Sequence, residues 1–262
     1  MQTTPLQSLA GVRVLITRPV AENRLLSAKL RALGAATVEL PTIAILPPAD
    51  KRLLDQSVRR LSEYDWVVFT SVHGVRFFSR RMAALGEPVR MLRRVKVAAI
   101  GPATAAALEK LCRKPDYVPG EFLSEQIAKG LGDVDGKRIL LPRADIASGK
   151  LPALLRKRGA IVEEVVAYRT VIPDDLSWHR LHSILKEGVD VVAFTSPSTV
   201  QNLARVAGAS RLEALLKGVK VACIGPVTAG ATKALGVHVD IVAPNHTIND
   251  LVEAIANEIR TV

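Results

Sequence analysis

Two stretches of the chain repeat each other and decide the fold: GVRVLI at 11–16 and GKRILL at 136–141. They begin 125 residues apart, and the same offset brings FTS at 69–71 onto FTS at 194–196. An offset of 124 brings VAAIGP at 97–102 onto VACIGP at 221–226, and shorter matches lie between these in the same order. This order predicts a domain-sized internal duplication, because a solenoid would repeat every ~20–50 residues.

Short apolar runs alternate with helical patterns inside each half. Between the first two runs, leucines recur at helical spacing and Gly34 provides a helix stop. Most runs are continuously apolar, which is typical of parallel strands buried on both faces. The pattern predicts an α/β fold with two flavodoxin-like, doubly wound parallel-sheet lobes. The candidate strands of the first half are 12–17, 37–45, 66–70, 95–100 and 117–118.

Two extended segments interrupt the pattern at equivalent places, 40–48 and 166–173. Both are rich in β-branched residues and end in proline, which disfavours helix at the preceding residue. We interpret them as a two-stranded linker. If both segments cross from one lobe to the other, one lobe comprises 1–44 with 174–262 and the other comprises 45–173. Two contiguous lobes are the open alternative, and in either case we expect the function to lie in the cleft between the lobes.

The composition predicts a globular protein, with 48% hydrophobic and 23% charged residues. No apolar run approaches the ~20 residues that a membrane helix needs. No basic stretch followed by an apolar run precedes Arg13, so we expect no secretory signal and a cytoplasmic location. Cys112 and Cys223 lack metal-ligand spacing, which favours reduced thiols that pack in the interior.

The formal charge of +11 calls for an explanation. Residues 76–114 alone contain ten basic side chains and two acidic ones. A nucleic-acid surface, an anionic small substrate and a solvated helix face all remain open as explanations. Aromatic residues are only 4% of the chain and no nucleic-acid-binding signature is present, so we expect no nucleic-acid partner.

The loops that follow the predicted strands are rich in hydroxyl groups. In an open parallel sheet, ligands bind beyond the carboxyl ends of the strands. Ser196 is a good N-cap and Pro197 suits the first helical position. A helix N-terminus carries about half a positive charge and free N–H donors, so these loops predict anion sites, with ordinary capping as the alternative. The four loops are 70–74, with Ser71, 101–104, with Thr104, 195–198, and 225–228, with Thr228.

Three further side chains each allow two interpretations of their role. Arg18 and Arg143 lie just past the first strand of each half, where they could bind an anion as forked donors or pair with a surface acid. Tyr168 lies in a connector, where its hydroxyl could face the cleft or its ring could simply pack, and the residues alone favour packing. No G-x-G-x-x-G follows the first strand, and the histidines lack partners at ligand spacing, so the residues disfavour a dinucleotide site and a metal site.

These motifs together resemble the uroporphyrinogen-III synthase family over nearly the whole chain. The pieces that carry the resemblance are ITRP at 16–19, the two FTS strand ends, the IGPxT turns at 100–104 and 224–228, and GA at 159–160 leading to VAYRT at 166–170. The resemblance implies two lobes joined by a two-stranded linker, and a monomeric, cofactor-independent carbon–oxygen lyase of porphyrin and heme biosynthesis.

The resemblance also implies a substrate. Family members cyclise hydroxymethylbilane, a polyanionic linear tetrapyrrole, to uroporphyrinogen III, losing water and inverting the last pyrrole ring through a spiro intermediate. By this resemblance Tyr168 is the candidate proton donor, and the preceding enzyme of the pathway is a candidate transient partner. A non-catalytic two-lobed binding protein for an anionic small molecule is the alternative from another class. The substrate-binding candidates are Arg18, Ser71, Thr104, Arg143, Ser196, Pro197 and Thr228.

Overall fold

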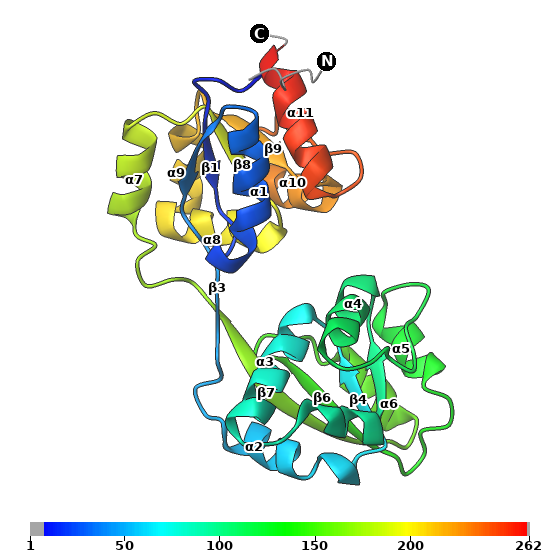
Figure 1. The fold of residues 1–262 in the computed structure, drawn as a ribbon. Coiled ribbons are helices and arrows are strands. Elements are labelled where there is room, and N and C mark those ends of the chain that lie inside the picture. The colour runs from blue at the N-terminus through cyan, green and yellow to red at the C-terminus, as the bar shows by residue number, and fades with distance from the viewer. Residues whose placement is uncertain (1–7, 261–262) are drawn as a thin grey trace. The chain divides into compact units, whose positions relative to one another are not determined.

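The computed structural model describes residues 8–260 and separates into two compact units (Figure 1). Unit 1 consists of Met1–Ala44 and Val171–Val262, and unit 2 consists of Ile45–Thr170. Each unit has its own five-stranded sheet and its own buried clusters. The chain therefore begins unit 1, builds unit 2 as an insertion, and returns to complete unit 1.

The sheet of unit 1 has the strand order β10-β9-β8-β1-β2. All four neighbouring pairs are parallel, with Val14 opposite both Thr37 and Val191. The carboxyl ends of its strands therefore meet at one edge of the sheet. The strands are β1 (Arg13–Ile16), β2 (Ala36–Glu39), β8 (Val191–Phe194), β9 (Lys220–Cys223) and β10 (Ile241–Val242).

Helices cover both faces of this sheet. Leu26 of α1 and Leu251 of α11 pack on the face that carries Val14 and Ile16, and Figure 1 shows these two helices side by side. Helices α7, α8, α9 and α10 cover the other face. The helices are α1 (Val20–Ala32), α7 (Trp178–Lys186), α8 (Pro197–Ala207), α9 (Ala209–Leu215), α10 (Pro226–Lys233) and α11 (Ile248–Arg260).

The sheet of unit 2 has the strand order β3-β7-β6-β4-β5. The pairs β7–β6, β6–β4 and β4–β5 are parallel, and Tyr117 adds an isolated parallel bridge beside Ala98. A shift of 124 or 125 residues matches four strands of this sheet with four strands of unit 1: β5 with β9, β4 with β8, β6 with β1, and β7 with β2. The matched strands stand in the same order across the two sheets. The strands are β3 (Ala44–Leu46), β4 (Trp66–Phe69), β5 (Lys96–Ala99), β6 (Arg138–Ala144) and β7 (Ile161–Val171).

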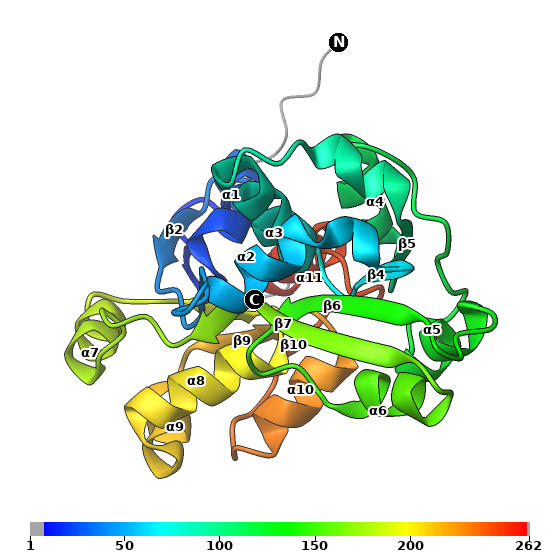
Figure 2. The same ribbon diagram turned by 90° about the horizontal axis from the view of Figure 1, so that it is seen from below.

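Helices cover both faces of this second sheet as well. Figure 2 shows α2 and α3 on one side of β6 and β7 and α6 on the other. Phe78 of α3 packs against Phe69 and Leu140, whereas Leu151 and Leu155 of α6 pack against the opposite face. The helices are α2 (Arg52–Arg59), η1 (Leu61–Glu63), α3 (Val72–Ala84), η2 (Val89–Arg94), α4 (Pro102–Leu111), α5 (Ser124–Gly130) and α6 (Lys150–Lys157).

Two strand boundaries differ from the sequence-based expectation. The run 37–45 is not one strand, because Pro41 has no N–H to continue a ladder and Thr42 instead donates its N–H to the Thr17 carbonyl (3.0 Å). The chain resumes as β3, which is the neighbour of β7. Residues 117–118 are not a strand, and Tyr117 alone forms an isolated bridge with Ala98.

The helices of the described region are short. Within residues 8–260, none is long and apolar enough to cross a membrane.

Candidate active site

Ser71 and Tyr168, 97 residues apart in the chain, are brought together at the carboxyl edge of the unit 2 sheet. Ser71 follows β4 and is the N-cap of α3, where its Oγ accepts the Gly74 N–H at 2.9 Å. The same Oγ lies 2.9 Å from the Tyr168 Oη, at hydrogen-bond distance. A phenol is thereby linked through one hydroxyl to the positive end of a helix.

An irregularity in strand pairing orients Tyr168 toward α3. The β6–β7 register shifts between Arg143, opposite Val166, and Ala144, opposite Tyr168, so Ala167 is an extra residue. A β-bulge breaks the alternation of side chains. Ala167 and Tyr168 accordingly both enter the buried cluster that α3 covers.

Asp145, the residue after β6, makes two hydrogen bonds with the backbone around this bulge. Its N–H donates to the Tyr168 carbonyl at 3.1 Å, and its Oδ1 accepts the Thr170 N–H at 3.0 Å. Asp145 therefore helps to position Tyr168, and the sequence analysis did not single it out. The repeat gives no signal for it, because the residue 125 positions earlier is Val20.

The surroundings of Tyr168 keep its phenol protonated. The residue is 7% exposed, and its ring stacks on Phe77 (5.9 Å between centroids) and lies 5.5 Å from the His73 ring. Burial raises the pKa of Tyr168 above its ordinary value of 10.0, and the Ser71 hydrogen bond offsets only part of that rise. The ring therefore packs in the interior, as the residues alone favoured, and its hydroxyl bonds to Ser71.

The equivalent corner of unit 1 has no phenol. Ser196 is the N-cap residue of α8 and Pro197 is its first helical residue. The Ser196 Oγ bonds to the Ser198 Oγ at 3.0 Å. The residue that corresponds to Tyr168 is Ile43, which is buried. The two strand ends have the same backbone arrangement, but among the described residues only the unit 2 corner carries a phenol.

Thr104 and Thr228 occupy matching positions in the first turns of α4 and α10. Both side chains are buried, and the Thr228 carbonyl accepts a hydrogen bond from the Thr232 hydroxyl at 2.8 Å. A buried side chain supports the turn rather than reaching outward. Contacts with a ligand at these turns would therefore fall to the backbone N–H groups of the helix ends.

Arg18 and Arg143 each pair with a carboxylate of their own unit. The Arg18 Nη2 donates to the Glu22 Oε2 at 2.6 Å. Arg143 is 7% exposed, and its Nη1 donates to the Glu164 Oε2 at 3.0 Å while its Nη2 bonds to the Ser148 carbonyl. Among the described residues, neither buried Nε atom has a hydrogen-bond partner. In this structure both arginines therefore pair with an acid, which was one of the two predicted alternatives.

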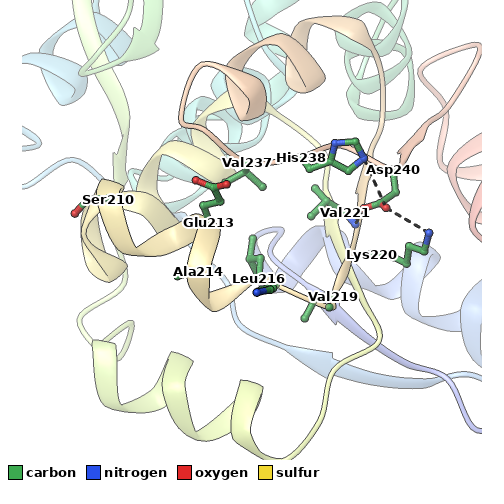
Figure 3. A pocket seen from close by; sticks show the side chains of 12 residues that line it. Ser210, Glu213, Ala214, Leu216, Val219, Lys220, Val221, Val237, His238 and Asp240 are labelled. Atoms are coloured by element: carbon green, nitrogen blue, oxygen red, sulfur yellow. Dashed lines mark hydrogen bonds and ion pairs between the residues drawn. The ribbon is translucent and has the colours of Figure 1, made fainter.

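A pocket of about 550 Å³ lies elsewhere in unit 1, around the amino-terminal end of β9. Figure 3 shows Lys220 and His238 directed at Asp240, and the Lys220 Nζ lies 3.4 Å from the Asp240 Oδ1. The lining includes none of the predicted site residues. In addition, residues 8–260 contain no group of three or more side chains that could hold a metal ion.

The Ser71 arrangement leads to a comparative prediction. Ser71→Ala removes both the helix cap and the hydrogen bond to Tyr168, so we expect a loss of about 1 kcal/mol in the free energy of unfolding and a severalfold lower kcat. Ser177→Ala is the matched control, since the Ser177 Oγ caps α7 by accepting the Arg180 N–H at 3.3 Å and Ser177 is not among the predicted site residues. Urea unfolding and steady-state kinetics measure both effects. An equal loss of kcat in the two variants would contradict the proposed link to the phenol.

Comparison with known proteins gives a consistent identity. The family model described as "Uroporphyrinogen-III synthase HemD" matches residues 25–253. The chain is 32% identical over 255 residues to the uroporphyrinogen-III synthase of Synechococcus elongatus, covering 95% of this chain and 96% of that protein. It is also 32% identical over 247 residues to a putative uroporphyrinogen-III synthase of Methanothermobacter thermautotrophicus, covering 92% and 96%.

The fold comparison agrees. A crystal structure of a mutant uroporphyrinogen III synthase from the extremely thermophilic bacterium Thermus thermophilus superposes with a TM-score of 0.68 at 23% identity, covering 96% of this chain and all of that one. The family match covers most of the chain. It agrees with the shared fold and with the sequence motifs at the strand ends. The chain belongs to the uroporphyrinogen-III synthase family.

Proposed function

We propose that this chain converts hydroxymethylbilane to uroporphyrinogen III, with loss of water and inversion of the last pyrrole ring, as a carbon–oxygen lyase that needs no metal or organic cofactor. Family membership supports the overall reaction. The observation that carries the mechanism is the buried, protonated phenol of Tyr168 hydrogen-bonded to the N-cap of α3. Family membership disfavours the binding-protein alternative.

In the proposed mechanism Tyr168 protonates the terminal hydroxyl of the substrate, which leaves as water. Ser71 donates a hydrogen bond to the resulting phenolate, and the N-terminus of α3 stabilises the negative charge. The electron-poor azafulvene is then attacked by the substituted carbon of the last ring to give the spiro intermediate. This fragments and closes again with the ring inverted, and the proton lost from the ring carbon restores the phenol.

Binding of the polyanionic substrate is assigned to the carboxyl edges of both sheets. Helices α3, α4, α8 and α10 all begin at these edges, and each start presents backbone N–H groups and a partial positive charge. Such ends can bind several carboxylates without a charged side chain. The arrangement favours positioning of the flexible chain as the main source of specificity. The residues assigned to binding are Arg18, Ser71, Thr104, Arg143, Ser196, Pro197 and Thr228.

We also propose that the two units arose by duplication and are the two lobes expected from the sequence, 1–44 with 174–262 and 45–173. The matching strand orders support the duplication. The linker is proposed to consist of 40–48 and 166–173, because β3 is the neighbour of β7 and the Arg169 Nε donates to the Pro47 carbonyl at 3.1 Å. The resemblance to the family further suggests a cytoplasmic monomer.

The isomer ratio of the product tests this function. Purified protein is supplied with hydroxymethylbilane, and the porphyrinogens are oxidised and separated by chromatography. We expect mainly the type III isomer, whereas the spontaneous reaction gives type I. A product that remains type I at every protein concentration would reject the synthase assignment.

The burial of Thr228 yields a prediction about substrate binding. Thr228→Ala should lower kcat/KM only about two- to tenfold, because the backbone N–H groups of α10 remain in place and one neutral hydrogen bond is worth ~0.5–1.5 kcal/mol. Thr228→Ser keeps the hydroxyl and should stay close to the parent. Complete inactivation of a folded Thr228→Ala protein would show that the side chain itself is indispensable.

A further inference from the structure

Two exposed rings occupy equivalent places in the two units. Phe122 of unit 2 is 57% exposed, and His246 of unit 1, 124 residues later, is also exposed. Phe122 lies against Gly101, the residue before α4, and His246 lies against Gly225, the residue before α10. Both rings therefore lie beside helix starts at the carboxyl edge of their sheet, next to the turns that carry Thr104 and Thr228.

The two glycines are explained by the rings and not by the backbone. Gly101 has φ of −167° and Gly225 has φ of 175°, extended values that any residue adopts. A Cβ at Gly101 would lie 3.2 Å from the Phe122 Cδ1, and one at Gly225 would lie 2.3 Å from the His246 Cδ2. A larger residue at Gly225 would displace the imidazole, and one at Gly101 would move the Phe122 ring by a few tenths of an ångström. The close approach of a ring to a helix start is thus built into both units.

The backbone at His246 reinforces this conclusion. With φ of 56°, His246 is the only non-glycine residue in the left-handed region within residues 8–260. Such a conformation is unfavourable for a residue with a side chain, and strained residues of this kind concentrate at functional sites. Phe122 reaches the same position without a positive φ. Two different loop conformations therefore place a ring at the same point.

Exposed aliphatic side chains flank both rings. Leu123 follows Phe122 and is largely exposed, and Val227, in the first turn of α10 two residues after Gly225, is 73% exposed. A helix start that binds only carboxylates does not need apolar neighbours. The combination of donor N–H groups with an exposed ring and an aliphatic side chain suits a ligand that is itself both anionic and aromatic.

We infer that Phe122 and His246 contact the substrate, each placing its ring against a pyrrole whose carboxylates bind at the adjacent helix start. This inference rests on the proposed function and adds two residues to its binding site. A pyrrole offers an apolar π face to Phe122, and the imidazole of His246 can in addition donate an N–H to a carboxylate. Both residues are assigned to binding and specificity, and neither takes part in proton transfer.

Three variants separate ring contact from loop stability. Phe122→Leu keeps apolar volume but removes the ring. His246→Gly removes the other ring and suits φ of 56°, so the melting temperature should not fall. Gly225→Ala keeps the imidazole but displaces it. We expect each variant to raise KM, and the Kd for uroporphyrin I measured by fluorescence, about three- to tenfold, while kcat stays within about twofold.

Ile161→Ala provides the matched control. Ile161 is an equally exposed aliphatic side chain, 59% accessible, but it begins β7 and so lies at the opposite edge of the unit 2 sheet. Its KM and its Kd for uroporphyrin I should match those of the parent. A control variant that weakens binding as much as Phe122→Leu would overturn the inference, because any loss of exposed apolar surface would then suffice.

The outcomes distinguish this inference from the proposed function. A parent protein that gives only the type I product overturns the proposed function itself. A parent that gives type III product, with Phe122→Leu and His246→Gly unchanged in KM and in Kd for uroporphyrin I, overturns the ring contacts alone. Variants that lose activity only in proportion to a lower melting temperature, with Kd unchanged, would also overturn them, because the rings would then serve only to pack the loops.

Discussion

Tyr168→Phe should lower kcat roughly 100-fold, at the lower end of the range for loss of a general acid, and leave KM nearly unchanged. The phenylalanine ring preserves the stacking on Phe77, whereas the oxygen that bonds to Ser71 is lost. The effect should therefore appear in the chemical step and not in folding. Single-turnover kinetics with hydroxymethylbilane measure it directly.

The pKa of Tyr168 adds a pH test of the same role. A proton donor works only while protonated, and burial raises the pKa of this phenol above 10.0. Deprotonation of Tyr168 should therefore cause no decline of kcat below about pH 10.

Tyr64→Phe is the control for Tyr168→Phe, since Tyr64 is buried in the same unit but precedes β4 at the opposite edge of the sheet. If kcat is the same for Tyr168→Phe and the parent, Tyr168 is not the donor.

Phe69→Ala should lower the free energy of unfolding of unit 2 by about 3–5 kcal/mol. Phe69 is fully buried at the end of β4 and meets Phe78 edge to face, with ring centroids 5.7 Å apart. Truncation leaves a cavity beneath α3, two residues before Ser71. Since a domain typically has only about 5–15 kcal/mol of stability, we expect activity to be lost on mild heating.

Phe69→Leu separates volume from aromatic contact. It fills most of the same space and should cost less than about 1.5 kcal/mol. Urea unfolding followed by hydrogen exchange assigns the loss to unit 2, because the two units need not unfold together. Equal costs for Phe69→Leu and Phe69→Ala would show that the core around α3 collapses onto the cavity.

Much of the fold follows from apolar runs and the repeat. Strands β1, β4 and β5 lie within runs that are apolar because both faces of each sheet are covered by helices. The same property hides finer features. The run from Val165 to Tyr168 is continuously apolar, so the bulge at Ala167 leaves no break in periodicity, and the separation of β2 from β3 depends on hydrogen bonds around Thr42.

The repeat is a weaker guide to the site than to the fold. It places Ser71 and Ser196 at equivalent helix starts, but only Ser71 meets a phenol, because Ile43 stands where unit 2 has Tyr168. The repeat also places Arg18 and Arg143 at equivalent positions. Their partners are not equivalent, because Glu22 lies four residues after Arg18 and Glu164 lies 21 residues after Arg143. Such asymmetries arise from side-chain contacts that a motif does not encode.

The insertion of unit 2 within unit 1 has a consequence for biosynthesis. On the ribosome, residues 45–170 emerge as one continuous segment that contains all the partners for its own core. Strand β1 pairs with β8 along one of its edges, and β8 is synthesised about 175 residues later. That edge of β1 therefore stays unpaired until β8 has emerged. Nascent chains should therefore acquire protease resistance first in the inserted segment, and the exposed β1 and α1 are the natural point at which chaperones would engage.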